Sequence, residues 1–322
     1  RQGIFLIGKP KQWIPAFGNM FKYAFSEKAY QGMMDTIKTR PTYKAMRESG
    51  LVLTDMSANL SSREEMFMSN LAEKIPIFGK IAKGSNRAYS GFLNKLRADV
   101  FDDLLSKAKN NNLLEDNSRI VDDISKFVNS ATGRGDLGKL SRANVVLNGA
   151  FFSPRLMASR INLLNPVYYA KLDPFVRKEA LKSLLTCGAV SGTTLTLASL
   201  SGAKVGVDPR SADFGKIKIG DTRFDVLGGF QQYAVLASRL ISGQMVSSTT
   251  GKEFTLGEGY KPTTRLDIVQ RFFESKTSPV ASFALGLMKG QTTMGEDFKV
   301  STEIADRFIP MVAQDMFDLY RE

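Results

Sequence analysis

The sequence predicts a mainly α-helical protein, an irregular bundle of many helices with one small β-hairpin. Apolar residues recur at three- and four-residue steps in several segments, which is typical of amphipathic helices. Strand-like alternation appears at about residues 216–226. With 322 residues, of which 43% are hydrophobic, the chain is long enough to bury a substantial core. We expect an arm at 1–74, a helical core at 75–205, a hairpin and loop insertion at 206–262, and C-terminal helices at 263–322.

The arm at residues 1–74 is aromatic and basic, and its prolines at positions 10, 15 and 41 predict short helices and turns. Its aromatic residues include Trp13, Phe17, Phe21, Tyr23 and Phe25. We expect this arm to be extended and to pack along a neighbour, without a core of its own. The Ser- and Asn-rich stretch 54–62 is predicted to be a connector.

The clearest helix of the predicted core covers residues 85–108. Its apolar side chains form one stripe, its charged side chains lie off that stripe, and Ser85 is the expected N-cap. A second amphipathic helix is expected at about 118–130. Adjacent acidic residues such as Asp102-Asp103 and Asp122-Asp123 point about 100° apart on a helix. We therefore expect them to be solvated rather than to work as acid–base pairs.

The stretch GRGDLGKL, residues 133–140, follows that second helix. It matches the dinucleotide fingerprint G-x-G-x-x-G, and it misses the phosphate-binding pattern G-x-x-x-x-G-K-[ST] at Leu140. A dinucleotide site needs a buried strand before the loop and an acidic residue about 20 positions after it, and the sequence offers neither. We therefore predict no cofactor, treat Arg-Gly-Asp as coincidence, and expect Gly133, Gly135 and Gly138 to form a tight turn with positive φ values.

Residues 137–172 contain no acidic residue and are expected to be helical, with a break at Pro154 and a turn at Asn165-Pro166. Arginines in this segment could contact phosphates while aromatic residues stack on bases. The alternative, which we favour, is a core helix whose arginines reach the surface along apolar stems. The candidate nucleic-acid or partner contacts are Arg142, Arg155, Arg160 and Lys171.

Residues 183–203, SLLTCGAVSGTTLTLASLSGA, carry no charge over 21 positions, which is long enough to span a bilayer. Their many Ser, Thr and Gly residues make the hydropathy marginal. Gly188 and Gly192 have the G-x-x-x-G spacing that lets helices approach closely. We favour a buried helix of a soluble bundle, with Cys187 as an inert buried thiol. Conditional membrane insertion is the alternative.

The alternating stretch KIKIGDTRFDV, residues 216–226, predicts two strands joined by a two-residue turn at Gly220-Asp221. That turn places Ile219 opposite Thr222 and Ile217 opposite Phe224. The apolar face then holds Ile217, Ile219, Phe224 and Val226, and the charged face holds Lys216, Lys218, Arg223 and Asp225.

The rest of the chain is expected to contain helices and one loop. The predicted helices lie near 230–240, 264–275, 279–289 and 302–320, and Pro310 is expected to kink the last one. Residues 243–263 are rich in Gly, Ser and Thr and are predicted to be a loop.

Composition limits the function. The chain has no histidine and one cysteine, which excludes Ser-His-Asp and Cys-His catalysis, His-ligated zinc and an internal disulfide. We therefore predict that this segment is not an enzyme and holds no metal. The net charge of +12 favours contact with nucleic acid, phospholipid or an acidic protein face. Because the chain begins Arg-Gln-Gly, we expect a segment of a longer polypeptide.

A series of motifs between about residues 75 and 320 resembles one protein family. In order, the motifs are IPIFGKIAKGSNRAYSGFLNKLRADVFDDL, NSATGRGDLG, LNGAFFSPRLMASRINLLNP, DPRSADFGKIKIGDTRFDVLGGFQQY, SSTTGKEFTLGEGY and TRLDIVQRFFESKTSPV. This series is similar to the large polyvalent-protein-associated domains of giant phage and prophage proteins. Residues 1–74 resemble that family only loosely.

The resemblance implies a structural domain of an internal virion protein, or ejection protein, of a short-tailed phage. Such proteins are packed in the virion interior near the portal, leave with or before the DNA, and help to form a conduit across the host envelope. The implied partners are further copies of the chain, portal, tail or other ejection proteins, packaged DNA, and the host membrane after ejection. The resemblance also implies that any catalytic domain, such as a virion RNA polymerase or a peptidoglycan hydrolase, lies elsewhere in a longer parent chain.

Two other classes of function stay open from the sequence alone. One is a sequence-independent DNA-binding module, which predicts binding that weakens steeply with salt. The other is a nucleotide-dependent enzyme that uses residues 133–139, which binding of labelled nucleotides would reveal.

Overall fold

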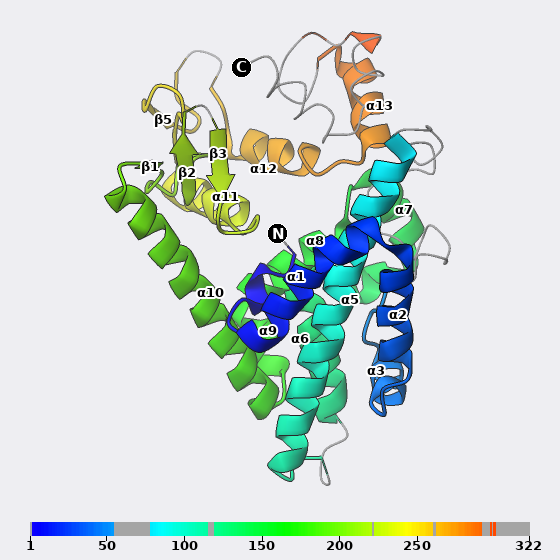
Figure 1. The fold of residues 1–322 in the computed structure, drawn as a ribbon. Coiled ribbons are helices and arrows are strands. Elements are labelled where there is room, and N and C mark those ends of the chain that lie inside the picture. Colours follow the sequence, from blue (N-terminus) through cyan, green and yellow to red (C-terminus); the bar gives the residue numbers. More distant parts are fainter. Residues whose placement is uncertain are drawn as a thin grey trace.

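The structure is a computed structural model that describes residues 2–54, 78–114, 119–220, 222–259, 262–291, 297 and 299–300. Within these ranges the chain is mainly helical, with two small antiparallel sheets, which confirms the predicted fold class (Figure 1). The helices are η1 (Ile4–Leu6), α1 (Pro10–Phe25), α2 (Glu27–Lys38), α3 (Tyr43–Glu48), α5 (Phe78–Asn110), α6 (Arg119–Ala131), η3 (Gly138–Ala143), α7 (Asn144–Ala150), α8 (Pro154–Leu164), α9 (Pro166–Lys171), α10 (Pro174–Leu200), α11 (Gln231–Ser242), α12 (Arg265–Glu274) and α13 (Pro279–Lys289). The strands are β1 (Lys204–Val205), β2 (Lys216–Ile219), β3 (Thr222–Asp225), β4 (Gln244–Val246) and β5 (Glu253–Thr255).

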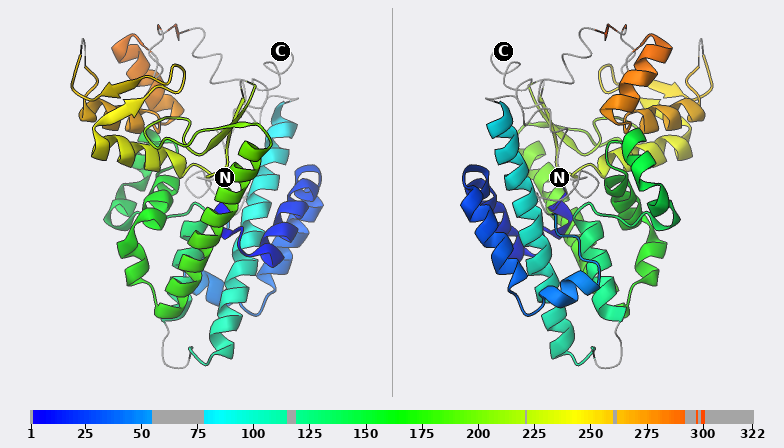
Figure 2. Two further views of the ribbon diagram at one scale, coloured as in Figure 1. Left: turned by 90° about the vertical axis from the view of Figure 1, so that its left-hand side faces the viewer. Right: turned by 90° about the vertical axis from the view of Figure 1, so that its right-hand side faces the viewer.

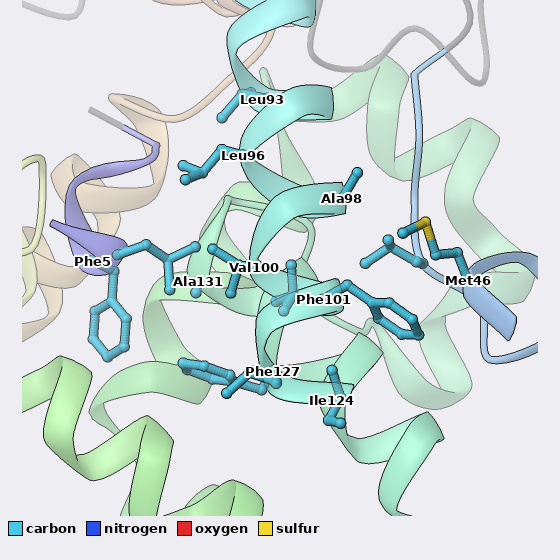
Figure 3. Close-up of a cluster of buried hydrophobic side chains, with 14 of the residues drawn as sticks. Phe5, Met46, Leu93, Leu96, Ala98, Val100, Phe101, Ile124, Phe127 and Ala131 are labelled. Atoms are coloured by element: carbon cyan, nitrogen blue, oxygen red, sulfur yellow. The ribbon is translucent and has the colours of Figure 1, made fainter. Parts of the chain in front are cut away.

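The core is built around α5, a helix of 33 residues that runs through the middle of the bundle (Figure 1). The predicted apolar stripe is buried: Leu96, Val100 and Phe101 of α5 lie in the same cluster as Phe127 of α6 (Figure 3). Full burial of a Leu, Val or Phe side chain contributes about 1.5–3 kcal/mol relative to exposure. The stripe at helical spacing therefore fixes which face of α5 the other helices cover.

The first 54 residues share this core and are not an extended arm. Phe5, Ile37 and Met46 are fully buried in it, and α1 and α2 lie along the outer side of α5 (Figure 2). The expected interruption at Pro15 is also wrong, because α1 continues through it. Pro15 has no backbone N–H, so the carbonyl four residues earlier in the helix lacks its usual hydrogen-bond donor. Because Pro15 is on the exposed side of α1, water can donate to that carbonyl instead. The predicted connector and the predicted boundary at residue 74 lie outside the described residues, apart from Thr54.

A buried polar network attaches the end of this N-terminal part to the core. Arg97 of α5 is fully buried and donates to the hydroxyl and the carbonyl of Thr132 at 2.8 and 3.1 Å and to the carbonyl of Val52 at 3.1 Å. Asn94, one turn earlier, both donates to and accepts from the backbone of Thr54 at 2.8 Å. Side chains thus replace a second strand as the partner of this extended segment.

The acid-free segment forms several short helices, broken where proline was expected to break them. Pro154 and Pro166 each begin a helix, α8 and α9, and Pro174 begins α10. Proline suits that position because its missing N–H would be unpaired there in any case. Asn165 caps α9 by accepting from the backbone N–H of Val167 at 2.9 Å.

Acidic residues that were expected at solvated faces take part in structural contacts instead. Asp123 is buried and accepts from the backbone N–H of Asp173 at 2.9 Å and from Lys126 at 3.1 Å. Asp102 accepts from Arg40 at 2.8 Å. Each carboxylate therefore joins two elements of the bundle, a role that the residue pairs alone do not reveal.

The predicted hairpin is present in the predicted register. Ile217 pairs with Phe224 and Ile219 with Thr222, and Gly220 in the turn has a φ of +58°. Asp221 of that turn lies outside the described residues. The strand β1 adds a third strand that the sequence did not predict. The apolar face is only partly covered, because Ile217 is buried while Ile219 and Phe224 are exposed.

The segment predicted to be a loop at 243–263 contains a second small sheet. The strands β4 and β5 pair antiparallel, with Met245 opposite Phe254. Their three-residue length gives almost no alternation to read in the sequence. The two following helices, α12 and α13, occupy the predicted places, and Thr264 and Ser278 cap their first turns. The predicted helix at 302–320, with Pro310, lies outside the described residues.

Candidate functional site

The loop GRGDLGKL is a packed joint between helices. It follows the helix α6, as expected, and Gly133, with a φ of +87°, ends that helix. The backbone N–H groups of Gly133 and Arg134 return to the carbonyls of Ser130 and Asn129 at 3.3 and 2.7 Å. This pair of bonds is the Schellman arrangement, which stabilises helix ends in many proteins. Arg134 is buried, so the Arg-Gly-Asp sequence does not present its arginine at the surface.

Gly135 serves close packing rather than a positive φ. Gly133 and Gly138 have positive φ values, as predicted, but Gly135 does not. A Cβ atom at Gly135 would lie 2.1 Å from the backbone nitrogen of Ser159 in α8. The N–H of Gly135 also donates to the carbonyl of Arg155 at 3.0 Å. The second glycine is therefore required where the loop meets α8, and the expectation of three positive φ values was wrong for this residue.

The four candidate nucleic-acid contacts do not form one exposed group. Arg160 is 3% exposed and donates from Nη2 to the carbonyl of Gly228 at 2.8 Å. Burial lowers the pKa of Arg160 to about 10, although nearby groups partly offset it. Its assignment as a surface contact was therefore wrong. Lys171 is exposed, Arg155 is half-buried, and the side chain of Arg142 lies outside the described residues.

The helix α10 runs along one edge of the molecule (Figure 1). Its inward and outward sides differ in burial and composition. The inner face of the uncharged segment carries Ser183, Cys187 and Ser191, all buried. These small side chains let α10 lie close to the bundle, and the hydroxyl of Ser191 donates to the carbonyl of Val226 at 3.3 Å. Burial raises the pKa of the Cys187 thiol, in agreement with the expected buried cysteine.

The outer face of α10 is exposed and uncharged, and it carries leucines together with glycines and threonines. Leu185 is 72% exposed, and Leu197 and Leu200 are also exposed. Within its most apolar window of 18 residues, only 17% of the residues are buried. The favoured interpretation of residues 183–203 as a buried helix was therefore wrong. Among the described residues, α10 is the helix long and apolar enough to cross a membrane, judged by length and composition.

The two glycines of the G-x-x-x-G spacing lie on this outer side. Gly188 and Gly192 are exposed, and a Cβ atom at either position would meet open space. They therefore pack against no other helix among the described residues. A flat surface of this kind allows the backbone of another helix to approach closely.

Hydroxyl groups of α10 are largely satisfied by the helix itself. The side chains of Thr186, Thr194 and Thr196 donate to the carbonyls four residues earlier at 2.8, 2.8 and 2.9 Å. A threonine bonded in this way no longer needs water for its hydroxyl donor. The marginal hydropathy of the sequence thus understates how apolar this surface is.

Lysines border the uncharged segment on both sides. Lys178 and Lys182 precede it and Lys204 follows it, and all three are exposed. The helical residues 183–200 extend about 27 Å at about 1.5 Å per residue. This length approaches the hydrocarbon thickness of a bilayer, about 30 Å. Lysines at the two ends suit contact with lipid headgroups.

An ionic cluster fixes the start of α10 to α1 and α5. Lys9 donates to Glu179 at 2.9 Å and to Asp103 at 3.3 Å, and Lys107 donates to Asp103 at 2.9 Å. Burial alone would raise the pKa values of both carboxyl groups. Hydrogen bonds and charges from Lys9 and Lys107 outweigh it, so the pKa values of Asp103 and Glu179 are lowered.

A cavity of about 300 Å³ opens beside this cluster, where α1, α5 and α10 meet. Its charged lining consists of Lys9, Lys11, Asp103, Lys107, Glu179 and Lys182. Four cations against two anions leave the lining positive. Its lining residues come from three distant segments of the chain, so no local pattern in the sequence predicts this site.

Comparison with known proteins returned no match to a family model, a curated protein or a solved structure. Within the described ranges, no three Asp, Glu or Cys side chains gather as a metal ion would need. The outer face of α10 is consequently the feature of the described residues that most requires a functional explanation.

Proposed function

We propose that this chain is a structural, non-catalytic domain of a phage internal virion or ejection protein. It is packed in the virion interior near the portal and helps to form a conduit for DNA across the host envelope. The observation that carries the proposal is the exposed, uncharged outer face of α10 with lysines at both ends. The motif series that resembles phage polyvalent-protein domains supplies the biological setting.

Contact with another apolar surface would stabilise the outer face of α10, because removing apolar surface from water contributes roughly 25 cal/mol per Å². In a crowded capsid interior, neighbouring copies and portal-proximal proteins provide that cover. The small residues Gly188 and Gly192 favour close helix packing between copies, in agreement with a homo-oligomer. After ejection, the same face meets the host membrane, where the internally bonded threonines need no water.

The alternative function is a sequence-independent DNA-binding module, which the net charge of +12 favours. Arg160 cannot serve it, because that side chain is buried against Phe230. Lys171 and Arg155 are the candidates that stay within reach. If Lys171→Ala and Arg155→Ala together reduce the salt dependence of DNA binding, this function gains support.

Virion composition tests the first proposal. Intact particles and particles emptied of DNA are compared by quantitative mass spectrometry, with the major capsid protein as the internal standard. The chain is expected in intact particles and is expected to be lost from emptied ones. Retention in full amount after DNA release contradicts the ejection function, and absence from intact particles contradicts any virion role.

A further inference from the structure

The helix α1 also carries an exposed apolar face, separate from that of α10. We call this face the aromatic ridge. It consists of Ile14, Phe17, Phe21 and Phe25, which are 63%, 39%, 56% and 89% exposed. Spacings of three, four and four residues place these side chains on one side of the helix. Four large apolar groups on one exposed helical face are more than scattered surface residues would explain.

The ridge is not a core face that happens to be loosely packed. The opposite side of α1 is already used, because Ala16 and Tyr23 are buried in the core. Trp13 lies between the two sides, donates to the carbonyl of Gly3 at 3.0 Å, and stacks on Phe17 with 4.9 Å between ring centroids. The helix thus packs one face on the bundle, with Phe17 at the edge of that face in T-shaped contact with the core residue Phe92 at 6.1 Å between ring centroids, and it exposes a second apolar face.

Charge indicates what that second face meets. α1 contains no acidic residue, and its lysines Lys11 and Lys22 are exposed. At about 100° per residue, both lysines lie on the outer side of the helix, next to the ridge. The acidic residue nearest to α1 in the sequence is Glu27, and its Oε2 atom already lies 3.9 Å from Nη1 of Arg87. An apolar ridge bordered by cations is complementary to a surface with anionic headgroups above an apolar layer.

The cavity at the start of α1 adds a place for such a headgroup. Lys11 belongs both to its lining and to the outer side of α1. Lys182, which borders the uncharged segment of α10, lines it as well. Lys9 and Lys107 are paired with Asp103 and Glu179, and Lys182 also interacts electrostatically with Glu179, so Lys11 is the lining cation left for a phosphate.

We propose that α1 lies in the plane of an anionic membrane, with the aromatic ridge at the boundary between headgroups and acyl chains. Lys11 and Lys22 then face headgroup phosphates. Helices of this type bury their apolar face about 5–10 Å into the membrane surface. The inference deepens the proposed membrane contact, on which its biological setting rests, by naming a second surface and its lipid class. It differs from the role proposed for α10, whose contact surface is the uncharged segment that begins at Ser183.

Trp13 makes the test specific, since it is the chain's single tryptophan. The whole protein is mixed with vesicles of phosphatidylglycerol and phosphatidylcholine whose acyl chains carry bromine, a short-range quencher of tryptophan emission. We expect quenching and a blue shift of Trp13 emission with anionic vesicles. On vesicles of phosphatidylcholine alone, we expect neither.

Two matched variants distinguish binding through the aromatic ridge from nonspecific binding through other exposed apolar residues. Phe21→Glu is expected to abolish quenching, whereas Phe254→Glu, at a residue 48% exposed on β5, is expected to leave it unchanged. Replacing both Lys11 and Lys22 by Ala is expected to raise the concentration of anionic vesicles needed for half-maximal Trp13 quenching roughly 30-fold, at about 1 kcal/mol per lysine. Phe25→Glu, at the most exposed position, repeats the test should Phe21→Glu unfold the protein.

The proposal is overturned if Trp13 is not quenched, if quenching is equal without anionic lipid, or if Trp13 is quenched as in the wild type in both Phe21→Glu and Phe25→Glu. Self-association without vesicles that Phe21→Glu abolishes would overturn it too, since the occupant would then be a second copy. Failure of this test leaves the proposed function standing, because virion composition is measured separately and the outer face of α10 does not depend on the aromatic ridge.

Discussion

Arg160 of α8 lies over the ring of Phe230, with 4.2 Å between the guanidinium carbon and the ring centroid. The same side chain donates to the carbonyl of Gly228 at 2.8 Å. Phe230 in turn packs against Phe5 of the N-terminal part, with 6.0 Å between ring centroids. This arginine therefore joins the end of the hairpin segment to the helical bundle, and it is not a surface cation.

Replacement of Arg160 should accordingly affect stability. We expect Arg160→Ala to lower the free energy of unfolding by about 2–3 kcal/mol, because it removes a charged hydrogen bond and a buried cation–π contact. Urea unfolding followed by circular dichroism measures this. Lys171→Ala, at an exposed position, is the control and should change stability by less than about 0.5 kcal/mol. Equal effects of the two variants would contradict the anchoring role.

The glycine loop makes a second prediction about stability. Gly135→Ala places a Cβ atom 2.1 Å from the backbone of Ser159, so either the loop or α8 must move. We expect a loss of about 3 kcal/mol, as for severe overpacking. Gly138→Ala meets open space and costs only the strain of its φ of +55°, about 1–2 kcal/mol. Thermal unfolding measures the stability of both variants, and we expect Gly135→Ala to be the less stable. If Gly138→Ala were the less stable variant, the close packing of Gly135 against α8 would be contradicted.

Acid should weaken the attachment of α10. The folded pKa values of Asp103 and Glu179 lie below their ordinary values of 3.8 and 4.5. Their stabilising effect is therefore present above about pH 4.5 and is lost as the pH falls through the lowered values. We expect Glu179→Gln to be less stable than the wild type near neutral pH, with the two converging in acid. Urea unfolding at several pH values tests this, with the exposed Glu258→Gln as control; a constant gap would contradict it.

What the sequence predicted well depends on local contacts. The hairpin register follows from Gly220 and the alternation around it, and the starts of α8, α9 and α13 follow from proline at their first turns. Short strands such as β4 lack that local signal. The candidate site was less predictable. Hydropathy identifies the uncharged half of α10, but it does not show which side of the helix the rest of the protein buries.

Three-dimensional proximity explains the other misses. Arg160 looks like any arginine in a basic segment, and only the packing of Phe230 against α8 shows that it is buried. The cluster of Lys9, Asp103 and Glu179 joins residues that are 94 and 170 positions apart. No spacing rule connects such residues, so their ion pairs and the cavity beside them emerge only from the fold.

The outer face of α10 carries the proposed membrane contact, and one matched pair of variants tests that contact directly. Leu185 and Leu266 are 72% and 73% exposed, on α10 and α12 respectively. Flotation with phosphatidylcholine vesicles, which lack the anionic lipid that α1 requires, compares Leu185→Lys, Leu266→Lys and the wild type. A lysine at the centre of a membrane-spanning helix costs about 2.5–3.5 kcal/mol, and Leu185→Lys, three residues after Lys182, should cost part of that. We predict that the wild type and Leu266→Lys float and that Leu185→Lys does not. Equal flotation of the two variants, or no flotation of the wild type, would contradict a lipid-contacting α10.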